Sequence, residues 1–135
     1  MPLTRWARVI GVGQQIDIEL EYEVSMPASF RCAVVLWFQG ACAFASVEPH
    51  EEERGRCGVY RSVVTIPPNL LAEGQYAVSV SLFSSRGVKS HLVREDDTVL
   101  FEVADPMDGT SARGDYAERM AGAVMPALTW RTALV

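Results

Sequence analysis

The amino-acid sequence predicts an all-β domain built as an antiparallel sandwich. Apolar and polar residues alternate with period two in two segments, 15–24 and 75–84, as they do in strands with one buried face. Turn-forming residues separate about seven short strand-like segments, and no segment has a sustained helical period. The 135 residues, 49% of them hydrophobic and 21% charged, fit one globular domain over residues 1–135.

The first alternating segment separates an apolar face from an acidic face. Its apolar residues are Ile16, Ile18, Leu20, Tyr22 and Val24, and its acidic residues are Asp17, Glu19, Glu21 and Glu23. The two sets point to opposite sides of a strand. A row of four carboxylates is typical of a metal site or of a solvated face, and we favour the solvated face because charges also discourage edge pairing.

The middle of the chain predicts a central strand followed by a hairpin. Residues 31–38 are apolar on both parities, which indicates a strand covered on both faces. Gln39-Gly40-Ala41 predicts the turn into a second strand, 42–46. The charged segment 48–55 predicts a polar loop outside the core, and the next strand, 59–66, ends at two prolines.

The last part of the chain predicts two further strands joined by a linker. In segment 75–84, Tyr76, Val78, Val80 and Leu82 face one way, and Ala77, Ser79, Ser81 and Phe83 face the other. After a turn at 84–87 we expect a polar connection at 89–97 and a strand at 99–103. Residues 104–127, which have no sustained period, predict a linker, and residues 128–135 predict a final strand.

Charge and cysteine content restrict the partners and the compartment. The net charge of −5 argues against binding to nucleic acid or to an anionic membrane, since both require a basic face. No apolar run approaches the length of a membrane span or of a signal peptide, and the three cysteines lack CxxC spacing, so we expect a cytoplasmic protein with reduced thiols. A zinc site from Cys42, His50 and Cys57 matches no common ligand spacing, and we expect no metal.

Motifs for catalysis and for cofactor binding are missing from the sequence. There is no nucleotide phosphate loop and no nucleophile elbow, and Gly11-Val12-Gly13 begins a dinucleotide fingerprint that Ile16 breaks. Both histidines lie in polar, loop-like segments, and the neighbouring acids Asp96 and Asp97 are expected to be solvated rather than paired across a cleft. The sequence therefore predicts a binding domain without a cofactor rather than an enzyme.

Residues 57–131 contain a series of short motifs in a fixed order: Tyr60, Ile66-Pro67, Leu70-Leu71, Gly74-Gln75-Tyr76, Val78, Phe101-Glu102-Val103, Gly114-Asp115-Tyr116, Gly122-Ala123-Val124, Pro126 and Trp130. This series resembles a known family, the C-terminal carbohydrate-binding domain of the Wzt-type ATPase subunit of O-antigen ABC transporters. The order of these pieces and the Gly-x-Val-x-Pro-x-x-x-Trp ending make the combination specific. The first half of the chain fits the family only in its strand pattern.

The resemblance implies an immunoglobulin-like sandwich in the cytoplasm that binds the non-reducing end of an O-antigen polysaccharide. It also implies a homodimer in which the last strand, 128–135, is exchanged, and partners that include the ABC transporter subunits at the inner face of the inner membrane. The ATPase part of the family is absent from this sequence. In the linker, the resemblance suggests structural roles for Arg113, Asp115 and Tyr116, with Tyr116 as an anchor and the Arg-Asp pair fixing a turn.

A sugar-binding site needs a flat aromatic side chain and polar groups on a rigid scaffold. We predict a trough on the outward face of segment 75–84, where small hydroxyl side chains alternate with the core residues. Arg61 and Thr65 have the parity to lie on the same outward face. Trp37 would supply the platform, unless it lies in the core, and Arg61 would bind an acidic group, unless it is an ordinary surface cation. The candidate ligand-binding residues are Trp37, Arg61, Thr65, Ser79, Ser81, Phe83, His91 and Arg94.

A second hypothesis is a non-catalytic dimerisation or accessory domain that supports a fused glycan-modifying transferase. Such a domain would have the same sandwich and a self-associating surface but no saccharide site. The neighbouring sequence in the full-length gene product distinguishes the two hypotheses, since an ATPase with a phosphate loop favours the first and a transferase favours the second.

Overall fold

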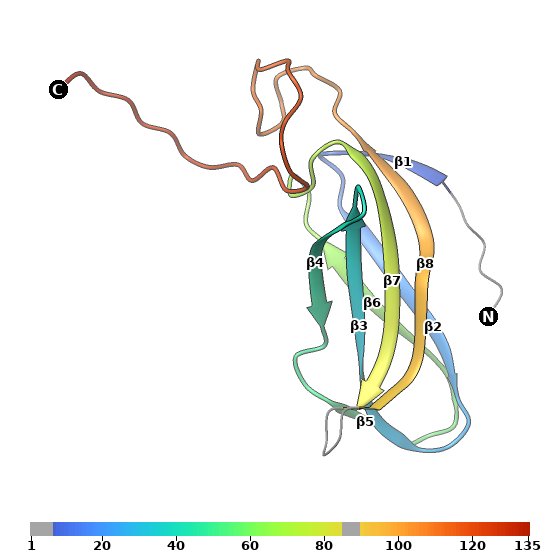
Figure 1. Ribbon diagram of the computed structural model, residues 1–135. Coiled ribbons are helices and arrows are strands. Elements are labelled where there is room, and N and C mark those ends of the chain that lie inside the picture. The colour runs from blue at the N-terminus through green and yellow to red at the C-terminus, as the bar shows by residue number, and fades with distance from the viewer. Residues whose placement is uncertain (1–6, 85–89) are drawn as a thin grey trace.

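The computed structural model describes residues 7–84 and 90–135, and the described part contains eight strands and no helix (Figure 1). The strands are β1 (Ala7–Gly11), β2 (Ile16–Val24), β3 (Ala28–Phe38), β4 (Ala41–Val47), β5 (Glu52–Arg54), β6 (Gly58–Ile66), β7 (Gly74–Ser84) and β8 (Ser90–Ala104). The all-β prediction is confirmed.

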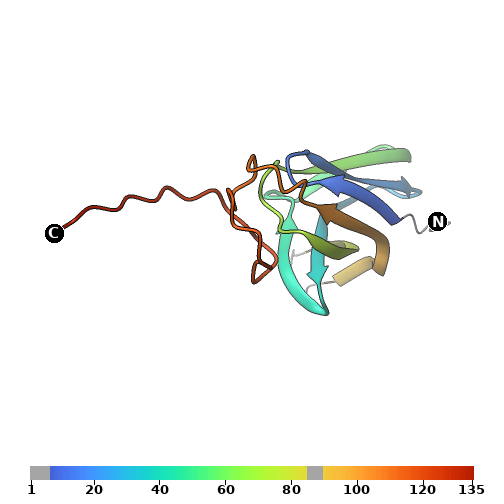
Figure 2. The same cartoon turned by 90° about the horizontal axis from the view of Figure 1, so that it is seen from above.

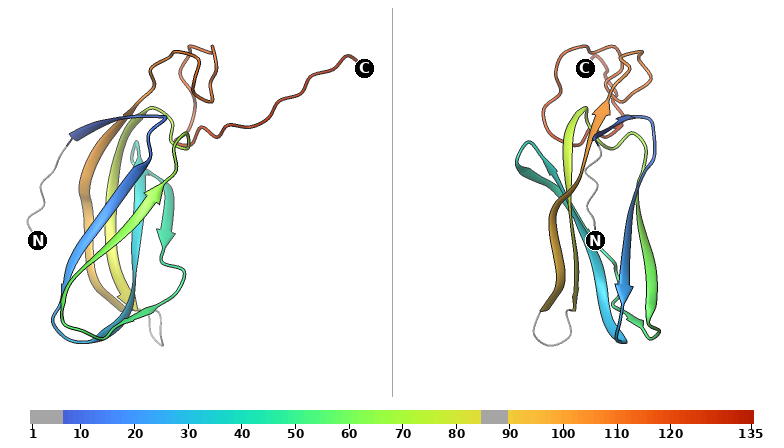
Figure 3. Two further views of the ribbon diagram at one scale, coloured as in Figure 1. Left: turned by 180° about the vertical axis from the view of Figure 1, so that it is seen from behind. Right: turned by 90° about the vertical axis from the view of Figure 1, so that its right-hand side faces the viewer.

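The strands form the two layers of a sandwich, which are seen edge-on in the right-hand view of Figure 3. The large sheet has the order β1-β8-β7-β3-β4, with β5 also pairing with β3, and the small sheet contains β2 and β6. All neighbours are antiparallel except β1 and β8, which are parallel. Strand β1 was not expected from the sequence, because its five residues are too few to show a period.

The core lies between the two sheets and follows the predicted alternation. Strand β2 buries Ile16, Leu20 and Val24 towards the large sheet and exposes its four acids. On β7, Tyr76 stacks against Phe101 of β8 with 5.3 Å between ring centroids. The acidic row is therefore the solvated outer face of the small sheet, as predicted.

Two segments that were predicted to be irregular belong to strands or to the core. Residues 90–97, expected in a polar connection, lie in β8, which runs from Ser90 to Ala104. The segment 48–55, expected outside the core, contributes β5, and its Arg54 is only 5% exposed. Sequence polarity was misleading in both places, because β8 is long enough to display charged residues outward and Arg54 finds partners inside the fold.

Ala104 of the predicted linker 104–127 still belongs to β8, and residues 105–127 contain no helix or strand, but part of this segment packs closely. Arg113 is buried and forms ion pairs with Glu73 at 2.7 Å and with Asp105 at 2.9 Å. The expected pairing with Asp115 is therefore wrong, since the partners come from the β6–β7 loop and from the end of β8. Tyr116, expected to be an anchor, is 52% exposed.

The C-terminal residues leave the body of the domain after a short anchor. Met125 is buried, its amide donates to the carbonyl of Leu70, and Val124 forms a β-bridge with Leu71. Residues 126–135 then extend away from both sheets (Figure 2) and form no strand in the single chain. The strand predicted at 128–135 is thus absent from the isolated chain, because no residue in 7–84 or 90–135 pairs with it.

Candidate functional site

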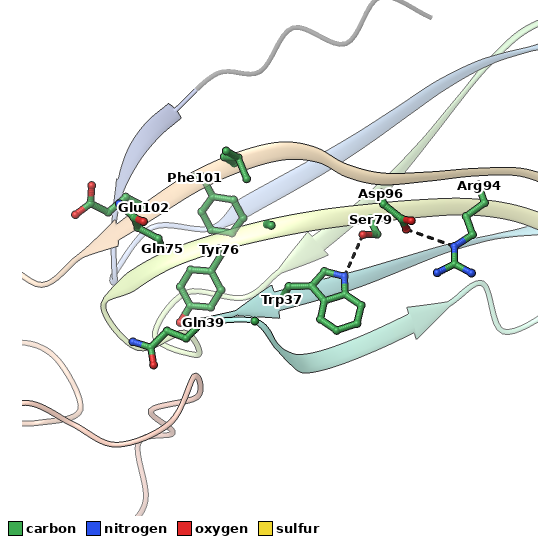
Figure 4. Close-up of a pocket in the computed structure, with 12 residues that line it drawn as sticks. Trp37, Gln39, Gln75, Tyr76, Ser79, Arg94, Asp96, Phe101 and Glu102 are labelled. Carbon is green, nitrogen blue, oxygen red and sulfur yellow. Dashed lines mark hydrogen bonds and ion pairs between the residues drawn. The ribbon is translucent and has the colours of Figure 1, made fainter.

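A hollow of about 760 Å³ opens on the outer face of the large sheet (Figure 4). Strands β3, β7 and β8 and the β3–β4 turn contribute its walls. Its lining residues are Trp37, Gln39, Gly40, Gln75, Tyr76, Ala77, Ser79, Arg94, Asp96, Leu100, Phe101 and Glu102. The lining thus combines one indole ring, two amides and three charged groups.

The indole ring of Trp37 is fixed in position by the neighbouring strand. Residue 37 of β3 stands opposite Ala77 of β7, so it points away from the core. Its Nε1–H donates to the hydroxyl of Ser79 at 3.0 Å, and Ser79 is only 7% exposed beneath it. Because the ring nitrogen is already bonded, Trp37 offers a ligand its apolar ring rather than a hydrogen bond.

The turn that bounds the hollow requires a left-handed backbone conformation at both of its central residues. Gln39 and Gly40 both have positive φ, 50° and 78°, and they join the paired residues Phe38 and Ala41. Positive φ at both central positions matches a type I′ hairpin, which suits the right-handed twist of the strands. Glycine adopts this conformation easily, whereas Gln39 does so at a cost. The turn thereby holds the Gln39 amide at the rim of the hollow.

Charged side chains lie on the β8 side of the hollow. Arg94 and Asp96 share one face of the strand and form an exposed ion pair, with 3.4 Å between Nε and Oδ1. Glu102 lies on the same face, opposite Gln75 of β7. Exposed ion pairs of this kind contribute little to stability, so these groups are available to exchange partners with a polar ligand.

The structure brings three of the predicted binding residues together and separates the others. Trp37, Ser79 and Arg94 line the hollow, whereas Ser81 and Phe83 continue the same face of β7 beyond it. The placement of Arg61 and Thr65 on this face is wrong.

Arg61 and Thr65 belong to β6, on the outer side of the other sheet. There Arg61 pairs with Glu21 at 3.3 Å, and Thr65 donates to Asp17 at 2.8 Å. The alternation fixed their parity, but parity does not tell which sheet a strand joins. The remaining candidate, His91, lies in β8 opposite Phe83, and its side chain is outside the described part of the structure.

Several lining residues were missed by sequence reasoning. Gln39, Gln75, Asp96, Leu100 and Glu102 all face the hollow. Residues 94, 96, 100 and 102 are all even-numbered, and alternate residues of a strand point to the same face. A strand predicted over the whole of 90–104 would therefore have placed their side chains on one face. The unrecognised length of β8 hid this signal.

A second polar cluster is buried between the sheets, away from the hollow. The guanidinium of Arg54 donates to Glu48 at 2.8 Å, to the carbonyl of Phe30 at 2.7 Å and to the hydroxyl of Tyr22 at 3.3 Å. It also lies 4.5 Å from the centroid of the Phe30 ring. Glu48 Oε1 in turn accepts the amide N–H of Cys32 at 2.8 Å. Every group in the cluster has a partner, which is the condition for burying charge without a large penalty.

The cluster shifts the pKa values of its members. Burial raises the pKa of the Cys32 thiol and of the Tyr22 phenol. Burial also acts to raise the pKa of Glu48, but hydrogen bonds from Cys32 and Arg54 outweigh it, and the net pKa lies below the ordinary value. A thiol held neutral and a carboxylate held in an ion pair have structural roles.

Metal binding and membrane insertion find no support among the described residues. Within residues 7–84 and 90–135 no group of three or more His, Cys, Asp or Glu side chains lies close enough to hold a metal ion. The same part of the chain contains no apolar helix that would traverse a bilayer.

Comparison with known proteins identifies a solved structure with a similar fold. No protein-family model matches the sequence, and no curated protein matches it. Among solved structures, the chain is similar to the one described as "Crystal structure of the C-terminal domain of wzt", with a TM-score of 0.71 and 12% sequence identity, over 93% of this chain and 74% of that one. At this identity the likeness concerns the fold. The chain is a β-sandwich that resembles the C-terminal domain of Wzt in three dimensions.

Proposed function

We propose that this domain binds the non-reducing terminus of a bacterial O-antigen polysaccharide and does not catalyse a reaction. The observation that carries the proposal is the outward-facing Trp37, held by Ser79 at 3.0 Å inside an open hollow whose rim bears amide and charged groups. A flat ring suits the apolar C–H face of a sugar, and rim groups such as Gln39 and Gln75 suit its hydroxyls. The motif resemblance and the fold likeness support the same assignment.

Binding would couple a finished chain to export. We propose that the domain works in the cytoplasm, at the inner face of the inner membrane, as part of an ABC transporter. It would act as a homodimer in which residues 128–135 are exchanged between two copies. The exposed Leu128, Trp130 and Leu134 support self-association, because apolar side chains in such numbers usually contact a partner.

Titration with the O-polysaccharide of the source organism tests the site. Trp37→Ala should weaken binding at least about tenfold, since truncating a central aromatic side chain usually costs about 1–2 kcal/mol or more. Arg61→Gln, on the outer face of the other sheet, is the matched control and should leave binding unchanged. Equal affinity of the wild-type protein and a folded Trp37→Ala variant would remove the hollow from consideration.

The second candidate function is that of a dimerisation domain for a fused transferase. The exposed apolar C-terminal residues favour it as much as they favour the first function. A stable dimer that binds no polysaccharide at any tested concentration would support this candidate over the first.

A further inference from the structure

The centre of the hollow is an apolar slot formed by three side chains in one row across the strands. Trp37 of β3 stands opposite Ala77 of β7, and Ala77 stands opposite Leu100 of β8. All three line the hollow, and residues paired across neighbouring strands point to the same face of a sheet. Trp37 and Leu100 are two strand spacings apart, about 10 Å, and only the methyl group of Ala77 stands between them. The slot therefore has two larger apolar walls and a small floor.

Uncharged amides border the slot on the side of the β3–β4 turn. Gln39 belongs to that turn, and Gln75 precedes Ala77 by two residues on the same face of β7. Amide groups both donate and accept hydrogen bonds without carrying a charge. This arrangement suits the hydroxyl groups around a sugar ring that lies over Ala77.

The charged groups of the hollow are predominantly negative. Arg94 is the single cation among the described residues that line it, and Asp96 holds Arg94 in an ion pair at 3.4 Å. The second carboxylate, that of Glu102, lies opposite Gln75, at the other end of the hollow from this pair (Figure 4). An anionic ligand would meet repulsion from both carboxylates, which the one guanidinium offsets only in part. The net charge of −5 on the whole chain acts in the same direction.

The cation that was expected to bind an acidic group lies elsewhere. Arg61 pairs with Glu21 at 3.3 Å on the outer side of the small sheet, away from the hollow. Phosphate and carboxylate groups are typically bound by an arginine that gives them two parallel hydrogen bonds. In the hollow, the Nε–H of Arg94 donates to Asp96 instead. The described lining therefore offers donors to a neutral sugar but no unpaired cation to an anionic one.

We propose that the hollow selects a terminal sugar residue without an anionic group, seated over Ala77 between Trp37 and Leu100. The inference rests on the proposed function and deepens it, because it names the chemical class of the terminus. The carboxylates of Asp96 and Glu102 exclude a terminus that bears a phosphate or a carboxylate. Ala77 controls access to the slot, since a larger side chain there fills the space between the two walls.

Calorimetric titration of the source organism's O-polysaccharide into the full chain tests the charge preference. Arg94→Gln keeps a polar donor, removes the positive charge and leaves Asp96 unpaired. Binding of an uncharged terminus should change less than about threefold, whereas binding of an anionic terminus should weaken at least about tenfold, because its cationic partner is lost. Mass spectrometry of the terminal residue of the same polysaccharide should show neither a phosphate nor a carboxylate.

Ala77→Leu tests the seat of the sugar. Binding should weaken at least about tenfold although Trp37 is retained, because the leucine side chain fills the slot and clashes with the ligand. Ala45→Leu is the matched control and should leave binding unchanged. Ala45 is exposed on β4 opposite Val35, on the same outer face of the large sheet but outside the lining of the hollow.

The possible results separate this inference from the proposed function. A larger loss than the expected one in Arg94→Gln, or a phosphate or carboxylate on the terminal residue of a polysaccharide that the wild type binds, would overturn the charge preference and leave the proposed function standing. Unchanged binding by a folded Ala77→Leu variant would overturn the seat over Ala77. If the wild type binds no O-polysaccharide, the proposed function itself fails, and this inference fails with it.

Discussion

Glu48 and Arg54 show how single residues decide the stability of this fold. Both lie in a segment whose composition is that of a solvated loop, yet Arg54 is almost fully enclosed and Glu48 is partly buried beside it. Their ion pair connects β5 and the β4–β5 loop to Phe30 of β3, and through Tyr22 to the small sheet. A buried pair of this kind is costly to break from one side, because the remaining charge loses its partner.

The lowered pKa of Glu48 predicts a pH dependence of folding. The folded state binds a proton at Glu48 less readily than the unfolded state does, so this contribution is present above the unfolded pKa, about 4.3, and is lost as pH falls through the lower folded pKa. In urea denaturation from pH 7 to pH 3, Glu48→Gln should cost about 2 kcal/mol at pH 7 and show a smaller loss towards acid than the wild type.

Glu53→Gln is the control for this experiment, since Glu53 is exposed in β5. It should change stability by less than about 0.5 kcal/mol. Identical acid profiles for the wild type and Glu48→Gln would show that the ion pair does not contribute.

Strand β7 organises the large sheet and also holds the start of the C-terminal segment. The Tyr76 hydroxyl donates to two carbonyl oxygens, that of Ala72 at 2.7 Å and that of Ala123 at 2.8 Å. Burial raises the pKa of Tyr76 to about 12, so the donor stays protonated at physiological pH. The Tyr76 side chain thus joins the β6–β7 loop to the segment that precedes the extended residues 126–135.

Removing that donor should loosen the anchor while leaving the sheet intact. Tyr76→Phe should cost about 1–2 kcal/mol, because buried carbonyls lose a hydrogen bond, and should speed hydrogen exchange at the amides of Ala72 and Met125. Tyr60→Phe provides the comparison, since the Tyr60 hydroxyl bonds the carbonyl of Arg56 at an exposed site. Losses of equal size in the two variants, with unchanged exchange, would contradict this role of Tyr76.

At the scale of the whole molecule, the single chain leaves apolar surface in water at its C-terminal end. Trp130 is 87% exposed and Leu134 fully exposed, while β2 and β6 form a sheet of only two strands with free edges among the described residues. Two-stranded sheets gain stability from a further strand, and the proposed exchange of the C-terminal segment between copies would supply one.

Deletion of residues 126–135 should therefore abolish the proposed dimer and leave a monomer, as measured by light scattering across a range of protein concentrations. The substitution of both Leu128 and Trp130 by serine should weaken the dimer without shortening the chain, because it removes apolar area worth about 25 cal/mol per Å². A monomeric full-length chain at high concentration would exclude exchange.

The sequence by itself determined the fold class and the two faces of most strands. Period-two alternation assigned Tyr76 and Val78 to the core and Ser79 to the outside, because side-chain direction in a strand depends only on parity. The same alternation placed the four acids of β2 on one face, and their charge predicted that this face is solvated.

Only the tertiary structure decided which strands share a sheet and which outward residues meet. Arg61 and Ser79 have equivalent patterns but lie on opposite outer faces, since strand pairing between distant segments is a property of the whole chain rather than of local sequence. The burial of Arg54 has the same cause. Local polarity predicts that this side chain lies in solvent, whereas the folded chain buries it beside Glu48, Tyr22 and Phe30. Parity is a local property, whereas the layer, the partner strand and the burial of a charge depend on contacts that form only when the sandwich closes.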